Sequence, residues 1–468
     1  MGYGQTWLFR YPAPLHDAAV GVEREYSRQP SYYDMDDMTD EEHTNTVAAV
    51  INRDKDVAAF SMTSIAHDRI LVTTPWTVCE LQYRNDDDQF HFSPLGLTKE
   101  STPTALDYAM SNATMPADSS LLACDVLHLW SSRSALVLLY QEPRGGRCWL
   151  TLQPFSTATP PDQSSTQILR QRFEQTSVPL KSVTVTVRNG QGRHFHGVLL
   201  FRTDSVVACG YIQDTNDSNH VQAEQLSTDA FASFFPHLVD CHGVTAYHTT
   251  TATSPASDTN ETPTTIRFLA LGCANGVLRV MAGPAAVDGF EAVACTKQFE
   301  LDGPISSLHL FNVADTIDRS AALSPYTCDV VVNSSIGYAV VYHHPFDVAC
   351  RPIILPESDH YDSLLCCVSA DIDMDGRPEL LLGTFSNALI AYASPDTPSG
   401  TWSVLPKPAW DFFFFGPVYS ILCQDMNGDG VDELVIASTD GIHVLEPDCD
   451  QVLEKLKAVL VALQQQDQ

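Results

Sequence analysis

The chain has 468 residues, of which 44% are hydrophobic and 18% charged, and its formal net charge at pH 7 is −32. A surface this acidic repels phosphate backbones and anionic lipid head groups, which argues against nucleic-acid binding and against direct membrane docking through basic residues. A basic patch on a protein partner would instead be attracted. The hydrophobic fraction is sufficient for a large folded core.

The N-terminus and the cysteines predict a cytoplasmic protein. Met1 to Trp7 contain no basic segment followed by an apolar one, so no secretory signal peptide is expected. The sequence contains no run of about 18 apolar residues, so direct membrane insertion is not expected. The 13 cysteines are scattered and form no C-x-x-C pair, which is typical of reduced, buried thiols in the cytosol.

Seven predicted β-hairpins follow one another along the chain, and helical periodicity is nearly absent before residue 450. Two of their turns are Asn275-Gly276 and Asp440-Gly441, dipeptides that a two-residue hairpin turn prefers. Repeats of about 50 to 70 residues, each with a hairpin, predict an all-β, seven-bladed β-propeller with long loops. The predicted hairpins span residues 70–81, 126–140, 198–211, 268–280, 330–342, 380–392 and 434–445.

We expect the propeller to occupy residues 1–448, with a first strand around residues 6–11 that completes the last blade and closes the ring. Serine, threonine, proline or acidic residues dominate several segments between the hairpins, and such compositions favour mobile loops. A short helix is expected within residues 220–237. The predicted long loops are at about 34–46, 101–120, 155–167 and 213–265.

The C-terminal segment, residues 450–466, differs from the rest because its apolar residues recur at three- and four-residue spacing. This spacing predicts a short amphipathic helix. Two packing arrangements stay open from the sequence, one against the chain's own propeller and one against a partner. The apolar positions are Val452, Leu453, Leu456, Val459, Leu460 and Leu463.

A short phrase recurs upstream of the last three hairpins. Residues 303–306 read Gly-Pro-Ile-Ser, residues 416–419 read Gly-Pro-Val-Tyr, and residues 362–364 stand at the equivalent place between them. Phe415-Gly416-Pro417 is similar to the FG-GAP phrase of integrin-type propellers. The resemblance implies a propeller of the FG-GAP, integrin-alpha-like type.

Two acidic loops, at residues 371–379 and 425–433, place side-chain oxygens at positions 1, 3, 5 and 9 and a glycine at position 6. Each leads into an apolar strand, and oxygen ligands around a sharp glycine turn are typical of a structural Ca²⁺ or Mg²⁺ site. The predicted ligands are Asp371, Asp373, Asp375, Glu379 and the carbonyl of Arg377 in the first loop, and Asp425, Asn427, Asp429, Glu433 and the carbonyl of Val431 in the second.

A simpler interpretation of the acidic loops needs no metal. Aspartate and asparagine side chains accept hydrogen bonds from backbone N–H groups in tight turns, and Arg377 places a positive charge beside the first loop. A catalytic role is not indicated, because no nucleophile, phosphate-binding or zinc-protease motif occurs in the sequence. The paired histidines His194 with His196 and His343 with His344 are interpreted as ordinary structural residues. We therefore predict a non-enzymatic protein with no catalytic residues.

The C-terminal half resembles the kaptin family in order and spacing over about residues 266–447. The segments that carry the resemblance are residues 271–280, 302–306, 339–342, 358–366, 371–380 and 430–445. It implies a scaffold subunit of the KICSTOR complex, which sits on lysosomes, holds the GATOR complex there and negatively regulates TOR-complex signalling when nutrients fall.

The same resemblance implies protein partners, namely other KICSTOR-like subunits with a second FG-GAP propeller among them. It places the chain in the cytoplasm, peripherally at the lysosome surface, and brings no catalytic residues. Kaptin is also described as actin-associated, so an actin-filament-associated cytoskeletal protein is the alternative. The acidity of the chain argues against that alternative, because actin is itself acidic.

Overall fold

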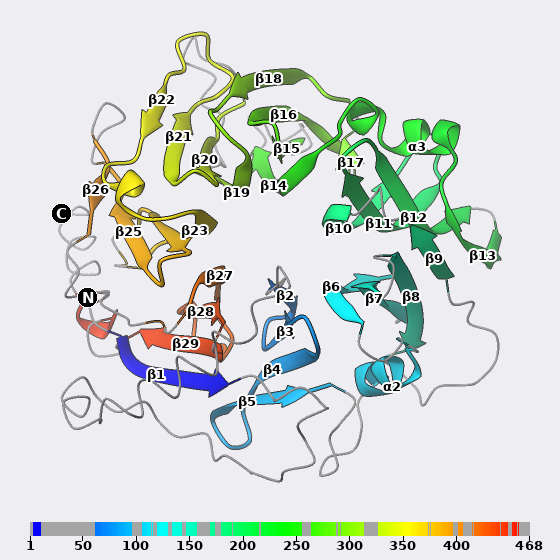
Figure 1. The fold of residues 1–468 in the computed structure, drawn as a ribbon, viewed down its shortest axis with the longest axis horizontal. Coiled ribbons are helices and arrows are strands. Elements are labelled where there is room, and N and C mark those ends of the chain that lie inside the picture. Colours follow the sequence, from blue (N-terminus) through cyan, green and yellow to red (C-terminus); the bar gives the residue numbers. More distant parts are fainter. Residues whose placement is uncertain are drawn as a thin grey trace, which may run out of the picture.

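The chain folds into a ring of seven antiparallel sheets around a central axis (Figure 1). This arrangement confirms the predicted seven-bladed β-propeller. The computed structural model describes residues 3–10, 61–95, 105–113, 115, 119–129, 133–142, 147–156, 169–173, 179–189, 191–214, 217–254, 264–286, 289–290, 292–312, 326–372, 374, 376–395, 401–405, 414, 416–439, 441–447, 452–455 and 457.

The first three blades each contain four strands, listed here from the inner strand outward. Blade one has β2 (Ser61–Ala66), β3 (Arg69–Thr73), β4 (Val78–Arg84) and β5 (Gln89–Pro94). Blade two has β6 (Ser120–His128), β7 (Arg133–Gln141), β8 (Cys148–Ser156) and β9 (Leu169–Phe173). Blade three has β10 (Pro179–Arg188), β11 (His194–Arg202), β12 (Val206–Asp214) and β13 (Asp217–Gln225).

The next three blades follow the same plan. Blade four has β14 (Val244–Ser254), β15 (Thr264–Cys273) and β16 (Val277–Ala286), which pairs with both β17 (Gly289–Phe290) and β18 (Cys295–Glu300). Blade five has β19 (Ile305–Phe311), β20 (Asp329–Ser334), β21 (Tyr338–His343) and β22 (Pro352–Ile354). Blade six has β23 (Leu364–Ala370), β24 (Glu379–Thr384), β25 (Leu389–Ala393) and β26 (Ser403–Val404).

Blade seven closes the ring with strands from both ends of the chain. Its strands β27 (Val418–Gln424), β28 (Glu433–Ser438) and β29 (Gly441–Pro447) are completed by β1 (Tyr3–Arg10), which pairs antiparallel with β29. The predicted closing strand around residues 6–11 is thereby confirmed. Strand β1 covers the outer edge of β29 and is itself the outermost strand of the blade.

The core consists of seven apolar clusters, and each cluster joins two neighbouring blades. The second strands are therefore apolar on both faces: every residue of β20, β24 and β28 is buried. Burial on both faces favours continuous apolar runs rather than strict alternation. One cluster joins blade seven to blade one, with Val435 and Val444 packed on Ile70 and Val72.

The inner strands of blades two to seven share a β-bulge near their start, after the second paired residue in blade two and after the first in blades three to seven. A bulge bends a strand and increases its twist, which suits a strand at the crowded centre of a ring. The residues at the six bulges are Leu122, Leu180, Thr245, Ser306, Leu365 and Tyr419.

Within the described residues, four short helices lie between the strands: α2 (Ala105–Asn112), α3 (Thr228–Phe234), η4 (Pro236–Leu238) and η5 (Ser358–His360). Helix α3 is the short helix expected within residues 220–237. Its N-terminus is capped by Ser227, whose Oγ accepts a hydrogen bond from the backbone N–H of Ala230. No helix in the described part of the chain is long and apolar enough to cross a membrane.

The prediction of a long loop over residues 213–265 is wrong, because that segment contains β13, α3 and β14. Its threonines are β-branched and suit a strand, although their composition suggests a loop. Thr249 Oγ1, for example, donates a hydrogen bond to the carbonyl of Phe268 on the paired strand β15. Helix α2 similarly lies inside the loop predicted over residues 101–120.

Six of the seven predicted hairpins are the middle pair of their blade, but the second is not. Residues 126–140 join β6 to β7, the first two strands of blade two, whereas the middle pair is β7 and β8. The predicted loop at 34–46 lies outside the described residues. Of the predicted C-terminal helix, residues 452–455 and 457 are described and helical.

Candidate functional site

The two acidic loops occupy the same place in adjacent blades, between the inner and the second strand. The first links β23 to β24, and the second links β27 to β28. Both turn through left-handed backbone at positions 4 and 6: φ is +55° at Met374 and +86° at Gly376, and +78° at Gly428 and +88° at Gly430. Glycine adopts this conformation without steric cost, which explains its place at position 6 of both loops.

The side chains of the second loop hold their own backbone. The two carboxylate oxygens of Asp425 accept hydrogen bonds from Gly428 N (2.7 Å) and Gly430 N (3.0 Å). Asn427 Oδ1 accepts from Asp429 N at 2.9 Å, and Asp429 Oδ1 accepts from Val431 N at 2.8 Å. This is the backbone-capping arrangement that tight turns with aspartate and asparagine form.

The first loop repeats one of these contacts and adds one from its last residue. Asp371 Oδ2 accepts a hydrogen bond from Gly376 N at 2.9 Å, as Asp425 does from Gly430. Glu379 Oε2 accepts from Ile372 N at 3.0 Å. Arg377 is exposed, and the predicted ligands Asp373 and Asp375 lie outside the described residues.

A buried carboxylate stands at the first position of β20, β24 and β28, in the same register of three successive blades. Glu379 pairs with the last residue of its inner strand, and so do Glu433 and Asp329. Glu433 Oε2 accepts a hydrogen bond from Met426 N at 2.7 Å, and burial raises the pKa of its carboxyl to about 7. We call Asp329, Glu379 and Glu433 the carboxylate clamps. Each accepts a hydrogen bond from the segment that follows its inner strand, and Asp329 also accepts one from the segment that follows its own hairpin.

Asp329 is the clamp that sequence reasoning missed. Its carboxylate accepts hydrogen bonds from Asn312 Nδ2 (2.9 Å) and His344 N (3.2 Å), and it forms an ion pair with His343 Nδ1 at 2.9 Å. This hydrogen bond raises the pKa of His343. His343 thus has a carboxylate partner that the spacing in the sequence does not reveal.

In the described part of the chain, six of the ten predicted ligands bind backbone N–H groups of the protein, two in the first loop and four in the second. In the second loop Asp425, Asn427 and Asp429 bind backbone N–H groups of the loop, and Glu433 points inward to Met426. Within the described residues no group of three or more His, Cys, Asp or Glu side chains is placed to hold a metal ion. These contacts match the interpretation without metal, and Ca²⁺ binding at either loop stays a prediction.

Calorimetric titration with Ca²⁺ tests that prediction. Heat of binding together with a higher Tm at millimolar Ca²⁺ would support the ion sites. Absence of both effects would contradict them and leave backbone capping as the whole role of the two loops. The Asp429→Ala variant is the matched control, because it removes a predicted ligand from the exposed part of the second loop.

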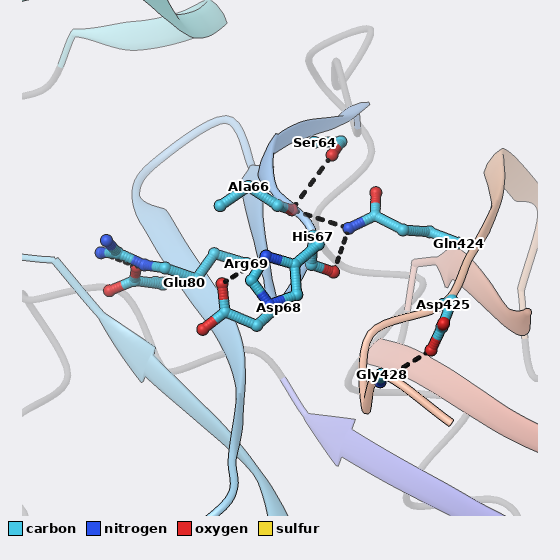
Figure 2. Close-up of polar contacts among 9 residues, drawn as sticks. All are labelled: Ser64, Ala66, His67, Asp68, Arg69, Glu80, Gln424, Asp425 and Gly428. Atoms are coloured by element: carbon cyan, nitrogen blue, oxygen red, sulfur yellow. Dashed lines mark hydrogen bonds and ion pairs between the residues drawn. The ribbon is translucent and has the colours of Figure 1, made fainter. Parts of the chain in front are cut away.

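The last residue of β27, next to the second loop, fastens blade seven to blade one (Figure 2). This residue, Gln424, donates from Nε2 to the carbonyl oxygens of Ala66, at 2.7 Å, and His67. Those carbonyls belong to the end of β2 and the β2–β3 turn, beside which Arg69 forms an ion pair with Glu80. Gln424 thus supports ring closure from the inner strands, while β1 closes the ring at the outer strand.

Residues 213–457, just over half of the chain, match the family model of the KICSTOR complex protein kaptin. The chain belongs to the kaptin family. Kaptin of Mus musculus, named as a KICSTOR complex protein, is 30% identical over 190 residues, which are 40% of this chain and 43% of the mouse protein. The chain therefore aligns with less than half the length of this kaptin relative.

The family match begins at the end of β12 and runs through blades four to seven, so it contains both acidic loops and all three carboxylate clamps. A crystal structure of BBS1N in complex with ARL6DN is 10% identical and covers 84% of this chain and 97% of that chain. Its TM-score of 0.34 is too low to compare the two folds.

Proposed function

We propose that this chain is a non-enzymatic scaffold subunit of a KICSTOR-like complex, which recruits the GATOR complex to lysosomes and negatively regulates TOR-complex signalling in response to nutrients. The observation that carries the proposal is the match of residues 213–457 to the family model of the KICSTOR complex protein kaptin. The fold is consistent with a scaffold, because a closed ring leaves its outer edges and loops for partners.

The hydrogen bonds of the acidic loops and the carboxylate clamps also favour a binding role over a catalytic one. The polar side chains of the acidic loops are engaged with their own backbone, and the clamps with the strand ends. Such contacts stabilise the fold and do not position a reactive group. Attachment to the lysosome surface would run through protein partners, since a net charge of −32 repels anionic lipid head groups.

Affinity purification of the tagged chain, expressed at its natural level and followed by mass spectrometry, tests the proposal. We expect other KICSTOR-like subunits, among them a second FG-GAP propeller, with the tag alone as the control. Recovery of none of these subunits would contradict the proposal. Co-sedimentation of the purified chain with actin filaments would instead favour the cytoskeletal alternative.

A further inference from the structure

A groove of about 560 Å³ opens between the outer parts of blades four and five. It is lined by the end of β18, by the link from β18 to β19, by β21 and β22, and by the turn that follows β22. Figure 1 shows β18 and β22 at the outer rim of the ring, away from the central axis. The volume is within the range of sites that bind small molecules or peptide side chains.

The floor of the groove is apolar and fixed in place. Tyr342 is buried, and its ring lies 4.3 Å from that of Phe299 on β18, centroid to centroid. The hydroxyl of Tyr338 accepts a hydrogen bond from Asp302 N at 3.0 Å, which fixes this ring beside the link between the two blades. Ile354 is 65% exposed, so an apolar side chain remains uncovered at the edge.

The rim of the groove is acidic. Four of its lining residues are Glu300, Asp302, Glu357 and Asp359, and all four are exposed. None of the described residues that line the groove is a lysine or an arginine. Glu357 has a left-handed backbone with φ of +60°, which is uncommon for a residue other than glycine and often marks a binding site.

We propose that this groove, which we call the acid–tyrosine groove, binds an extended segment of a protein partner that carries arginine side chains. Arginine matches the groove in three ways: its charge matches the carboxylate rim, its planar guanidinium can stack on the partly exposed ring of Tyr338, and its alkyl stem can pack on apolar surface such as Ile354. A second copy of this chain is a poor occupant, because two chains of charge −32 repel one another.

Recognition by side chains fits the local strands better than addition of a strand. Strand β22, the outermost strand of blade five, has three residues and begins with Pro352, which has no N–H to donate. The proposal rests on the proposed scaffold function in one respect, namely that the chain binds protein partners.

A peptide-binding measurement tests the groove directly. The probe is a fluorescein-labelled octapeptide of alternating arginine and leucine, and its matched control carries citrulline, which keeps the shape of arginine without the charge. The groove variant combines Glu300→Gln, Asp302→Asn, Glu357→Gln and Asp359→Asn. The control variant removes four exposed charges elsewhere, by Asp86→Asn, Glu224→Gln, Asp240→Asn and Glu454→Gln.

We expect the arginine peptide to bind the wild type and the control variant with Kd values within twofold of each other, and the groove variant at least tenfold more weakly. Ile354→Ser should weaken binding about threefold without any change of charge. Equal losses in the groove and control variants would overturn the proposal, since binding would then follow total charge. Equal binding of the citrulline peptide would overturn it as well.

The same variants separate this proposal from the proposed function. If the wild type recovers KICSTOR-like subunits from cells and the groove variant loses at least one of them, both proposals are supported. Equal recovery by the two chains would overturn the groove as a partner site while the scaffold function stands. If the wild type recovers none, the scaffold function fails, and the peptide measurement still decides the groove.

Discussion

Blades four and five fasten their inner strands to the next blade differently from blades two and three, although each of these inner strands carries a β-bulge near its start. At the bulge of β14, Thr245 Oγ1 donates to the carbonyl of Ile305 at 2.6 Å, and at the bulge of β19, Ser306 Oγ donates to the carbonyl of Leu364 at 2.5 Å. The bulges of blades two and three hold Leu122 and Leu180, whose side chains cannot donate a hydrogen bond.

Blades two and three are joined instead by Asp125, which accepts a hydrogen bond from Thr184 at 2.7 Å. We call these hydrogen bonds of Thr245 and Ser306 the hydroxyl joints. The second of them coincides with one copy of the phrase that recurs in the sequence, since Ser306 is the last residue of the Gly-Pro-Ile-Ser segment. In that copy the phrase marks how blade five is fastened to blade six. It lies in the part of the chain that matches the kaptin family model.

Loss of β1 should lower the stability of the protein the most, because this N-terminal strand completes blade seven. Deletion of residues 1–10 removes seven paired positions against β29, and we expect the free energy of unfolding to fall by at least about 3 kcal/mol. Urea denaturation measures the change. A synthetic peptide of residues 1–12 should restore part of the loss, and an unchanged midpoint after deletion would contradict the closed ring.

Truncation of a carboxylate clamp should have the next largest effect on the free energy of unfolding. Glu433→Ala leaves the N–H of Met426 without its acceptor, at a cost of roughly 2 kcal/mol in the free energy of unfolding. Glu433→Gln retains an acceptor oxygen and should cost less. Ser134 stands at the same register in blade two, so Ser134→Ala is the matched control, with an expected change under about 1 kcal/mol. Equal losses of stability in Glu433→Ala and Ser134→Ala would contradict a special role of the clamp in blade seven.

Removal of a hydroxyl joint should have a smaller effect. Thr245→Val and Ser306→Ala each lose hydrogen bonds between neighbouring inner strands, and we expect about 1 kcal/mol for each in thermal unfolding. Ser205→Ala, which removes an exposed hydrogen bond to Asp204, is the control and should change stability by less than about 0.5 kcal/mol. Hydroxyl variants no less stable than this control would show that the joints contribute nothing.

The pair of His343 and Asp329 should give the smallest effect, as a pH dependence. Asp329 raises the pKa of His343 in the folded state, so the stabilisation is present below the ordinary histidine value and is lost as pH rises through the folded pKa. Between pH 6 and 8 the wild type should therefore lose more stability than His343→Gln. Parallel stability curves for the two proteins would contradict the ion pair.

Much of the fold could be predicted from the sequence, because apolar runs and asparagine–glycine or aspartate–glycine turns are local signals. The closing strand β1 was also predictable, since a ring of seven hairpins needs one more strand at its end. The loop prediction over residues 213–265 failed because composition hides β13 and β14. The second predicted hairpin fell on β6 and β7 because both of these strands are apolar runs.

The sites were less predictable. The acidic loops are contiguous in the sequence, so their position between two strands could be read directly. Asp329 belongs with Glu379 and Glu433 only through the register of three blades, which a search for linear motifs does not show. The acid–tyrosine groove combines residues around 300, 340 and 355, and only the packing of blade four on blade five brings them together.

We propose that this chain acts as a scaffold that restrains TOR-complex signalling. The most direct test of this role measures the phosphorylation of a TOR-complex substrate after amino-acid withdrawal, in cells that lack the chain. The phosphorylation should stay high in these cells and fall again when the wild-type chain is restored. A normal fall in the absence of the chain would contradict the claim.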